Sequence, residues 1–442
     1  MTTRFALRAL LCLAFALTSI EVRGSVALQS FGVTPSVPGT HVFDSIGPIG
    51  PPGAESGPGA SVAWPVTVDL ALLNTLPVTL QVNFPDRSPV TLLRMRSERW
   101  SAGTFLWTGR GADCSAIFRM AASGLKGMIS CINAPYGIHH PAGSSSLRLT
   151  RYDDAGNQIW PEPFPGLPAG AMPSGPAPAP PVGKPDNTID ILVLYNGHLT
   201  STPIWENARD QVIAIQHAMD LSTSPGQPVI AKIRLAGAAR ISRAEDNAPA
   251  GDLPALRTDP EVLALRDYWA GDVVLYLTTG NCTVPGGVQG IANLPGYQGM
   301  PLPGPNFAQY AIAVSLIDCS DNPGDWVAAH EFAHTFGANH NPDHGIPNPT
   351  PVQPYAFGHW ARETGTDDPL AARTIMSYLT ECIQVVNPCP RIPHYSNPDI
   401  EVGGWFTTGT ALRNNAKVIK LYAPVMALYR DSKGRIFKHG FE

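Results

Sequence analysis

The feature that most limits how this chain can fold is a proline-rich stretch near its middle. Residues 160–185 contain the runs Pro-Glu-Pro, Pro-Gly-Leu-Pro and Pro-Ala-Pro-Ala-Pro-Pro. Each proline removes a backbone donor and fixes φ, so this density favours an extended, solvated chain over helix or strand. We therefore expect a linker over 160–186, an N-terminal domain over 28–159, a C-terminal domain over 187–430 and a tail over 431–442.

The composition excludes two broad classes of protein. Hydrophobic residues make up 44% of the 442 positions, which is enough to build a core and argues against wholesale disorder. The formal net charge is −5 and no long block of either sign occurs. A nucleic-acid-binding protein would concentrate basic residues on one face, so we expect no nucleic-acid partner.

The N-terminus has the pattern of a secretory signal. Arg4 and Arg8 precede an apolar run over 9–20, and small residues follow. A membrane anchor is the alternative, but a spanning helix needs roughly 20 apolar residues. Cleavage after Ala27 or after Gly24 fits the pattern, and we take 1–27 as the signal. We expect a secreted monomer, passing through a periplasm if the source is Gram-negative, with no membrane association after signal removal.

Six of the seven cysteines lie beyond the signal. An even number in an exported chain suggests disulfides, although six cysteines allow fifteen pairings. Neighbours in sequence suggest Cys114–Cys131, Cys282–Cys319 and Cys382–Cys389. The alternative is that some of them are buried free thiols.

The two domains differ in their patterns. Residues 60–152 are mostly extended, with strands expected over 66–70, 78–84 and 147–149. The C-terminal domain predicts strands over 189–195, 229–235, 272–278 and 310–317, a short edge strand over 287–292, and helices over 203–221, 259–269, from near 325, and 416–430. Alternating strands and helices indicate an α/β domain preceded by a β-rich one.

One short stretch carries metal chemistry. His330 and His334 are four residues apart, so a helix projects both imidazoles from one face toward a single zinc ion. Glu331 then lies beside the metal, where it can take a proton from a metal-bound water. Gly337 can adopt a positive φ and end the helix, which brings His340 back as a third ligand. A helix with surface histidines and no metal is the alternative.

The run Thr-Ile-Met-Ser-Tyr over 374–378 follows downstream. A zinc helix followed by a methionine turn resembles the metzincin clan of zinc endopeptidases. The resemblance implies that His330, His334 and His340 bind zinc, Glu331 is the general base, and Met376 forms the floor beneath the ligands. Tyr378 is similar to a tyrosine that astacin-like and serralysin-like members place near the metal, which implies a catalytic role. Ordinary core positions for Met376 and Tyr378 are the alternatives.

The resemblance extends over 189–430. The segment 266–274, Cys282, Cys319 and the segment 395–399 are similar to bacterial members of the reprolysin-like (adamalysin-like) branch. Asn341 stands where adamalysins carry aspartate. In the N-terminal domain, the segments 84–86, 105–109 and 127–129 resemble the propeptide of reprolysin-like proteases. The implied fold is a metzincin catalytic domain, with a mixed twisted sheet, zinc helix and Met-turn, behind a propeptide-like β-rich domain.

These observations predict a secreted zinc metalloendopeptidase that hydrolyses protein or peptide substrates and is made as a zymogen. The alternative is a catalytically silent secreted adhesion or binding protein on the same scaffold. Four polar residues precede the zinc helix and fit either a calcium loop or an N-cap provided by the last of them: Asp318, Asp321, Asn322 and Asp325.

Overall fold

The computed structural model describes 43–45, 60–101, 103–121, 123–139, 146–152, 187–196, 204–243, 249–279, 289–317, 326–342, 351–366, 369–379, 382 and 389–430. All of these belong to one compact unit, Gly39–Glu442. Within these ranges, no helix combines the length and apolar character that a bilayer crossing requires. The signal over 1–27, the linker over 160–186 and the tail over 431–442 lie outside the described residues.

The N-terminal part forms a nine-stranded sheet in the order β1-β2-β9-β8-β7-β6-β5-β4-β3, with every neighbouring pair antiparallel. The strands are β1 (Phe43–Ser45), β2 (Ala60–Val68), β3 (Thr79–Val82), β4 (Val90–Ser101), β5 (Thr104–Arg110), β6 (Cys114–Ala121), β7 (Gly124–Cys131), β8 (Ala134–His139) and β9 (Leu147–Tyr152).

A disulfide joins the open end of one hairpin in this sheet. Cys114 on β6 and Cys131 on β7 face each other in register, with a Cα–Cα distance of 4.0 Å, and they form a disulfide. The expected pair is therefore confirmed, and neither cysteine can offer a thiolate to a metal. Trp107 and Phe118 fill the core of this part, and both side chains are fully buried.

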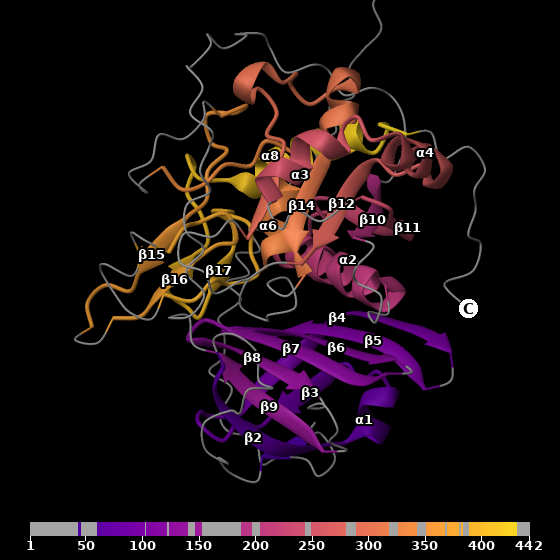
Figure 1. Cartoon of the computed structure of the whole chain (residues 1–442). Helices are drawn as coiled ribbons and strands as arrows, with labels where there is room; N and C mark the ends of the chain where they lie inside the picture. Colours follow the sequence, from indigo (N-terminus) through magenta and orange to yellow (C-terminus); the bar gives the residue numbers. More distant parts are fainter. Residues whose placement is uncertain are drawn as a thin grey trace, which may run out of the picture. The chain divides into compact units, whose positions relative to one another are not determined.

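The C-terminal part contains a five-stranded sheet in the order β11-β10-β12-β14-β13. The strands are β10 (Thr188–Asn196), β11 (Lys232–Ile241), β12 (Val273–Thr278), β13 (Gly290–Ala292) and β14 (Ile312–Leu316). All pairs are parallel except β13 with β14, which is antiparallel and lies at the edge. Figure 1 shows β10, β12 and β14 side by side.

Both faces of this sheet are covered, which explains why β10, β12 and β14 are nearly continuous apolar runs. The edge strand β11 instead alternates exposed and buried residues over its first half. On β10, Ile191 and Val193 pack into one core cluster, whereas Leu192 and Leu194 pack into another. The first cluster contains residues of α2 (Ile204–Leu221), α6 (Val327–His334) and α8 (Asn415–Met426). The second contains residues of α3 (Pro249–Leu256) and α4 (Pro260–Trp269).

The remaining elements are short. They are the helix α1 (Leu70–Asn74), the 3-10 turns η3 (Tyr297–Gly299) and η4 (Pro305–Tyr310), and two hairpins, β15 (Trp360–Arg362) with β16 (Ala371–Arg373) and β17 (Glu401–Val402) with β18 (Phe406–Thr407). The expected β-rich part followed by a mixed α/β part is confirmed.

Three expected elements differ from the structure. The strand expected over 229–235 instead runs from Lys232 to Ile241, because pairing with β10 continues through small residues such as Gly237 that lack strand propensity. A side chain at Gly237 would collide with Trp269, which packs there. The strand expected over 66–70 ends at Val68, because Asp69 caps α1 by accepting from the Leu72 N–H. The position before α6 that serves as its N-cap is Trp326, so Asp325 is not the cap.

Candidate metal centre

Two of the candidate ligands come from α6. His330 and His334 lie one turn apart on this helix and are 1% and 2% exposed. Their Nε2 atoms are 3.2 Å apart. The four-residue spacing therefore brings both rings to one point, inside the protein rather than on its surface, and the surface-histidine alternative is wrong.

A glycine turn brings the third histidine to the same point. Gly337 has φ +90°, and a Cβ on it would lie 2.3 Å from Cγ2 of Val352, so both the conformation and the space require glycine. The chain then reverses, and His340 Nε2 lies 3.0 Å from the Nε2 atoms of both His330 and His334. His340 is fully buried.

Two backbone carbonyls decide which nitrogen these rings offer. His330 Nδ1 lies 2.8 Å from the Ile375 carbonyl oxygen, and His334 Nδ1 lies 2.7 Å from that of Ala338. A carbonyl only accepts, so each Nδ1 carries the proton and donates it, and each Nε2 presents a lone pair. Two lone pairs at this separation repel unless a cation lies between them. The arrangement therefore fits a metal ion at the point where the three Nε2 atoms converge.

The donor set and its protonation fit zinc. Tetrahedral zinc held at about 2.0–2.1 Å by nitrogen keeps its ligand atoms about 3.3 Å apart, close to the separations here. Burial lowers the pKa of His334 to about 4. Burial, followed by the neighbouring His334 and Arg391, lowers the pKa of His330 well below its ordinary value. Both rings are therefore neutral near pH 7, as metal ligands must be. The three histidines form the one metal-capable group among the residues that the structure describes.

Glu331 lies next to the trio but is not part of it. Its side chain is 2% exposed and approaches Gly290 of the edge strand β13. A buried carboxylate beside three neutral imidazoles can exchange a proton with a water at the metal.

The segment 374–378 lies against the three histidines, since the Ile375 carbonyl contacts His330 and Tyr378 lies beside His340. Met376 and Tyr378 are fully buried, and the Tyr378 ring centroid is 4.1 Å from that of His340. The Tyr378 N–H donates to Asn341 Oδ1 at 2.9 Å, which ties the turn to the residue after the third histidine. The structure thus brings His330, His334, His340 and Tyr378 together, with Gly337 in the turn between His334 and His340, while Met376 is buried in the adjoining segment.

Sequence reasoning missed an arginine that holds the turn. Arg373, 1% exposed, donates to the carbonyl oxygens of Ser377 and Cys389. Cys389 is disulfide-bonded to Cys382, as expected, so this arginine links the segment 374–378 to the disulfide. No periodicity marks Arg373 in the sequence, because its partners are backbone atoms. Two further predictions lie outside the described residues, the Cys282–Cys319 pair and the calcium loop, as do positions 287 and 288 of the expected edge strand.

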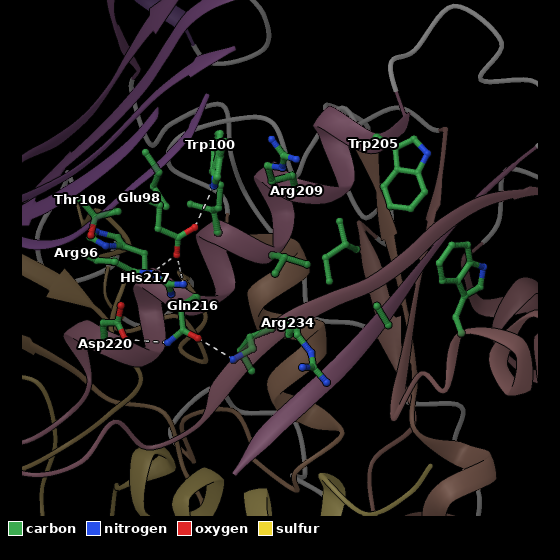
Figure 2. A pocket seen from close by; sticks show the side chains of 17 residues that line it. Arg96, Glu98, Trp100, Thr108, Trp205, Arg209, Gln216, His217, Asp220 and Arg234 are labelled. Carbon is green, nitrogen blue, oxygen red and sulfur yellow. Dashed lines mark hydrogen bonds and ion pairs between the residues drawn. The ribbon is translucent and has the colours of Figure 1, made fainter. Parts of the chain in front are cut away.

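A separate cavity of about 850 Å³ lies away from the trio, and none of the three histidines lines it. Figure 2 shows α2 forming one wall, with Gln216 bonded to Asp220, while Trp100 of β4 approaches from the opposite wall. The Arg209 guanidinium lies 4.3 Å from the centroid of the Trp100 ring. Burial lowers the pKa of His217, also in the lining, to about 3. This cavity therefore offers a largely apolar space with a neutral imidazole, not a metal centre.

The comparisons with known proteins connect the chain with metallopeptidases. No family model matches it. Over 126 residues the chain is 31% identical to a protein of Stenotrophomonas maltophilia (strain K279a) named peptidyl-Asp metalloendopeptidase. The match covers 28% of this chain and 27% of that relative, so the chain spans about a quarter of the relative's length.

Two solved structures are similar in part. One, described as the structure of a chaperone-substrate complex, covers 70% of this chain and 40% of its own, with 16% identity and a TM-score of 0.39. The other, metalloproteinase-II from Bacteroides fragilis, covers 61% of this chain and 83% of its own, with 13% identity and a TM-score of 0.34. Because both TM-scores are this low, the fold assignment depends on the strand order and register described above.

Proposed function

We propose that this protein is a secreted zinc metalloendopeptidase of the metzincin type. One observation carries the proposal: three buried imidazoles converge on one point, and backbone carbonyls fix two of them with the lone pair facing inward. Three protein ligands leave a fourth position for water or a substrate carbonyl, which is the pattern of catalytic rather than structural zinc. The partial likeness to a metalloendopeptidase points the same way.

The chemistry would be divided between the metal and two side chains. Zinc, when bound by His330, His334 and His340, supplies Lewis acidity and lowers the pKa of water. Glu331 accepts the proton of the attacking water and later delivers it to the leaving amine. The hydroxyl of Tyr378, whose ring lies beside that of His340, would donate to the oxyanion in the transition state.

The edge of the sheet would hold the substrate. β13 pairs with β14 on one side and ends the sheet order on the other. An extended peptide can add to such an edge through main-chain hydrogen bonds. Glu331 adjoins this strand at Gly290, so the added peptide would pass close to the general base.

Secretion and synthesis as a zymogen are part of the proposal. The signal-like N-terminus supports export. The propeptide-like β-rich part would keep the enzyme latent until the linker is cut and this part is removed. If removing the β-rich part after the cut leaves activity unchanged, the latency proposal is wrong.

The proposal is tested by replacing the base while keeping the metal ligands. Glu331→Ala should retain one zinc per chain by metal analysis and lose casein cleavage, because only the proton acceptor is removed. Glu401→Ala, at an exposed position of β17, is the matched control and should behave as wild type. Activity should disappear with a chelator and return with added zinc.

The same assay separates the enzyme from a silent binding protein. A wild-type protein that binds zinc yet cleaves neither casein nor a peptide library would support the binding alternative. Full activity in Glu331→Ala would rule out the proposed mechanism. The library should include aspartate at every position, because the relative's name refers to peptidyl-Asp bonds.

A further inference from the structure

A glycine occupies the point where the edge strand β13 meets the Glu331 side chain. A Cβ placed on Gly290 would lie 2.6 Å from Cγ, 2.7 Å from Oε1 and 2.9 Å from Cδ of Glu331. Real Cβ atoms essentially never approach a heavy atom within 3.0 Å, so something must shift if position 290 carries a side chain. The atoms in the way are the carboxylate itself and the methylene that carries it.

The strand backbone does not require this glycine. Gly290 is absent from the residues with positive φ, and it pairs in register with Ser315 of β14 as an ordinary antiparallel residue. Glycine at the start of a strand still costs stability, because it has no side chain to pack and loses more entropy on folding. The benefit that offsets this cost is the close approach of Glu331.

The Glu331 side chain is held on its other sides as well. It is 2% exposed, and its neighbours on α6, His330 and Phe332, are 1% and 0% exposed. His330 is fixed by its bond to the Ile375 carbonyl, so the helix cannot rotate without moving a ligand. A side chain at 290 would therefore move the carboxylate rather than the helix.

We propose that Gly290 is a positioning residue: by leaving no side chain, it sets the Glu331 carboxylate against the strand that would bind the substrate backbone. This inference rests on the proposed function. The base and the substrate are then placed relative to the same strand. Without a side chain at position 290, the carboxylate lies directly against the β13 backbone.

The first test is kinetic, with Gly290→Ala compared with wild type and with Gly304→Ala. The control adds the same methyl group where the nearest atom, the Leu302 carbonyl oxygen, is 3.7 Å away. We expect kcat of Gly290→Ala on a peptide substrate to fall by about 10- to 100-fold, since a small misplacement of a catalytic group has costs of this order. KM and zinc content should stay close to wild type, because neither the strand register nor the ligands change.

A second readout is the pH profile of kcat/KM. The acidic limb reports the carboxylate in the free enzyme, so it should shift in Gly290→Ala and stay in place in Gly304→Ala. An effect on packing alone would lower the rate without moving this limb. A Gly290→Ala enzyme with wild-type kcat, or one whose lost activity follows lost zinc, would overturn the inference.

A double-mutant cycle on stability covers the case in which Gly290→Ala folds poorly. If the clash is with the Glu331 side chain, Gly290→Ala should lower Tm in the wild-type background and have little effect in a Glu331→Ala background. Equal losses in both backgrounds would contradict the inference. If the wild-type protein shows no cleavage that a chelator abolishes, the proposed function is wrong. If the wild-type protein is active and Gly290→Ala is equally active, only the inference about Gly290 is wrong.

Discussion

At the scale of single residues, two carbonyl oxygens and one glycine determine what the histidines can do. Ile375 and Ala338 accept from His330 and His334, which leaves both Nε2 atoms as acceptors. Gly337 then lets His340 reach the same point. The backbone atoms that orient these ligands leave no pattern in the sequence, whereas the spacing of the histidines is visible there.

Gly337→Ala should move His340 away from His330 and His334. The substitution adds a Cβ at φ +90° and 2.3 Å from Val352, so it combines backbone strain with a clash. We expect it to lower stability by about 1–3 kcal/mol and to weaken zinc binding. Tm and zinc titration provide the measurements.

The control for this change separates strain from the clash. Gly299 has φ +78° with nothing within 4 Å of an added Cβ, so Gly299→Ala carries the strain alone. It should lower Tm slightly and leave zinc affinity unchanged. Equal zinc affinity in wild type and Gly337→Ala would show that the turn does not position His340.

The residues of the metal motif could be predicted from the sequence, because helical spacing and a glycine stop are local properties. Their supports could not. Gly290 acts through its lack of a side chain, and Arg373 acts through the carbonyls of Ser377 and Cys389, which lie on other segments. Asn341 was visible only as a departure from a family pattern, and its bond to the Tyr378 N–H gives it a role.

At the scale of elements, α2 carries an ionisable group inside the protein. His217 is 2% exposed and its ring stacks on Trp326, the N-cap of α6, with centroids 6.5 Å apart. Burial lowers its pKa to about 3. Burial also lowers the pKa of His394 to about 3, with His217 a further cause. His217 therefore lies at the contact between α2 and the start of α6, and its imidazole is neutral in the folded protein near pH 7.

This histidine predicts acid sensitivity with a definite sign. Between pH 6.5 and 3 the unfolded chain binds a proton at His217 that the folded chain does not, so the free energy of unfolding falls as pH falls. At pH 5 the cost is roughly 2 kcal/mol, from about 1.4 kcal/mol per unit. His217→Phe cannot bind a proton and keeps an aromatic ring against Trp326. Urea unfolding at pH 7 and pH 5, with chelator present, should show a smaller loss in the variant than in wild type.

Most other titrating groups are the same in both proteins. His394 is the exception, because His217 helps to lower its pKa and the variant removes that contribution. Burial raises the pKa of Asp220 to about 6, which acts in the opposite direction as pH falls. The same pH dependence in His217→Phe and in wild type would mean that His217 is protonated in the folded protein.

Elements with a strong local pattern could be predicted to within a few residues. α4 begins at Pro260 after the Asp259 N-cap, and β12 is an unbroken apolar run, so both matched expectation. β11 did not, because its second half is small residues held by pairing with β10. α3 had no prediction, since Pro254 lies inside it and its apolar spacing is weak. Tertiary pairing, not local propensity, decides such cases.

At the scale of the whole described unit, the nine-stranded sheet contacts α2 through a buried ion pair. The Arg119 side chain, 6% exposed, forms an ion pair with Asp210, and Oε2 of Glu206 lies 3.7 Å from the Arg119 guanidinium. Lys126 also lies 3.4 Å from Asp210. Leu106 and Ile117 share the core cluster of α2. A contact with buried charge and buried apolar surface predicts that the two parts remain associated without the linker.

Asp210→Ala should weaken this association. It leaves Arg119 buried without its nearest partner, which costs about 3 kcal/mol. With a protease site inserted in 160–186 and cut, the wild-type parts should co-elute on gel filtration and the variant parts should separate more readily. Asp267→Ala is the control, because Asp267 is 71% exposed and its pair with Arg430 is worth less than about 1 kcal/mol. Separation of the wild-type parts on cutting would contradict the prediction.

The three ligands lie within one short piece of chain, on α6 and the turn that follows it. A cross-link that closes so small a loop removes little freedom from the unfolded chain, because loop-closure entropy grows with the number of residues enclosed. Both core clusters, by contrast, draw together segments from across the C-terminal part. The metal would therefore contribute little to the stability of the fold, so the chain could fold first and bind the ion afterwards.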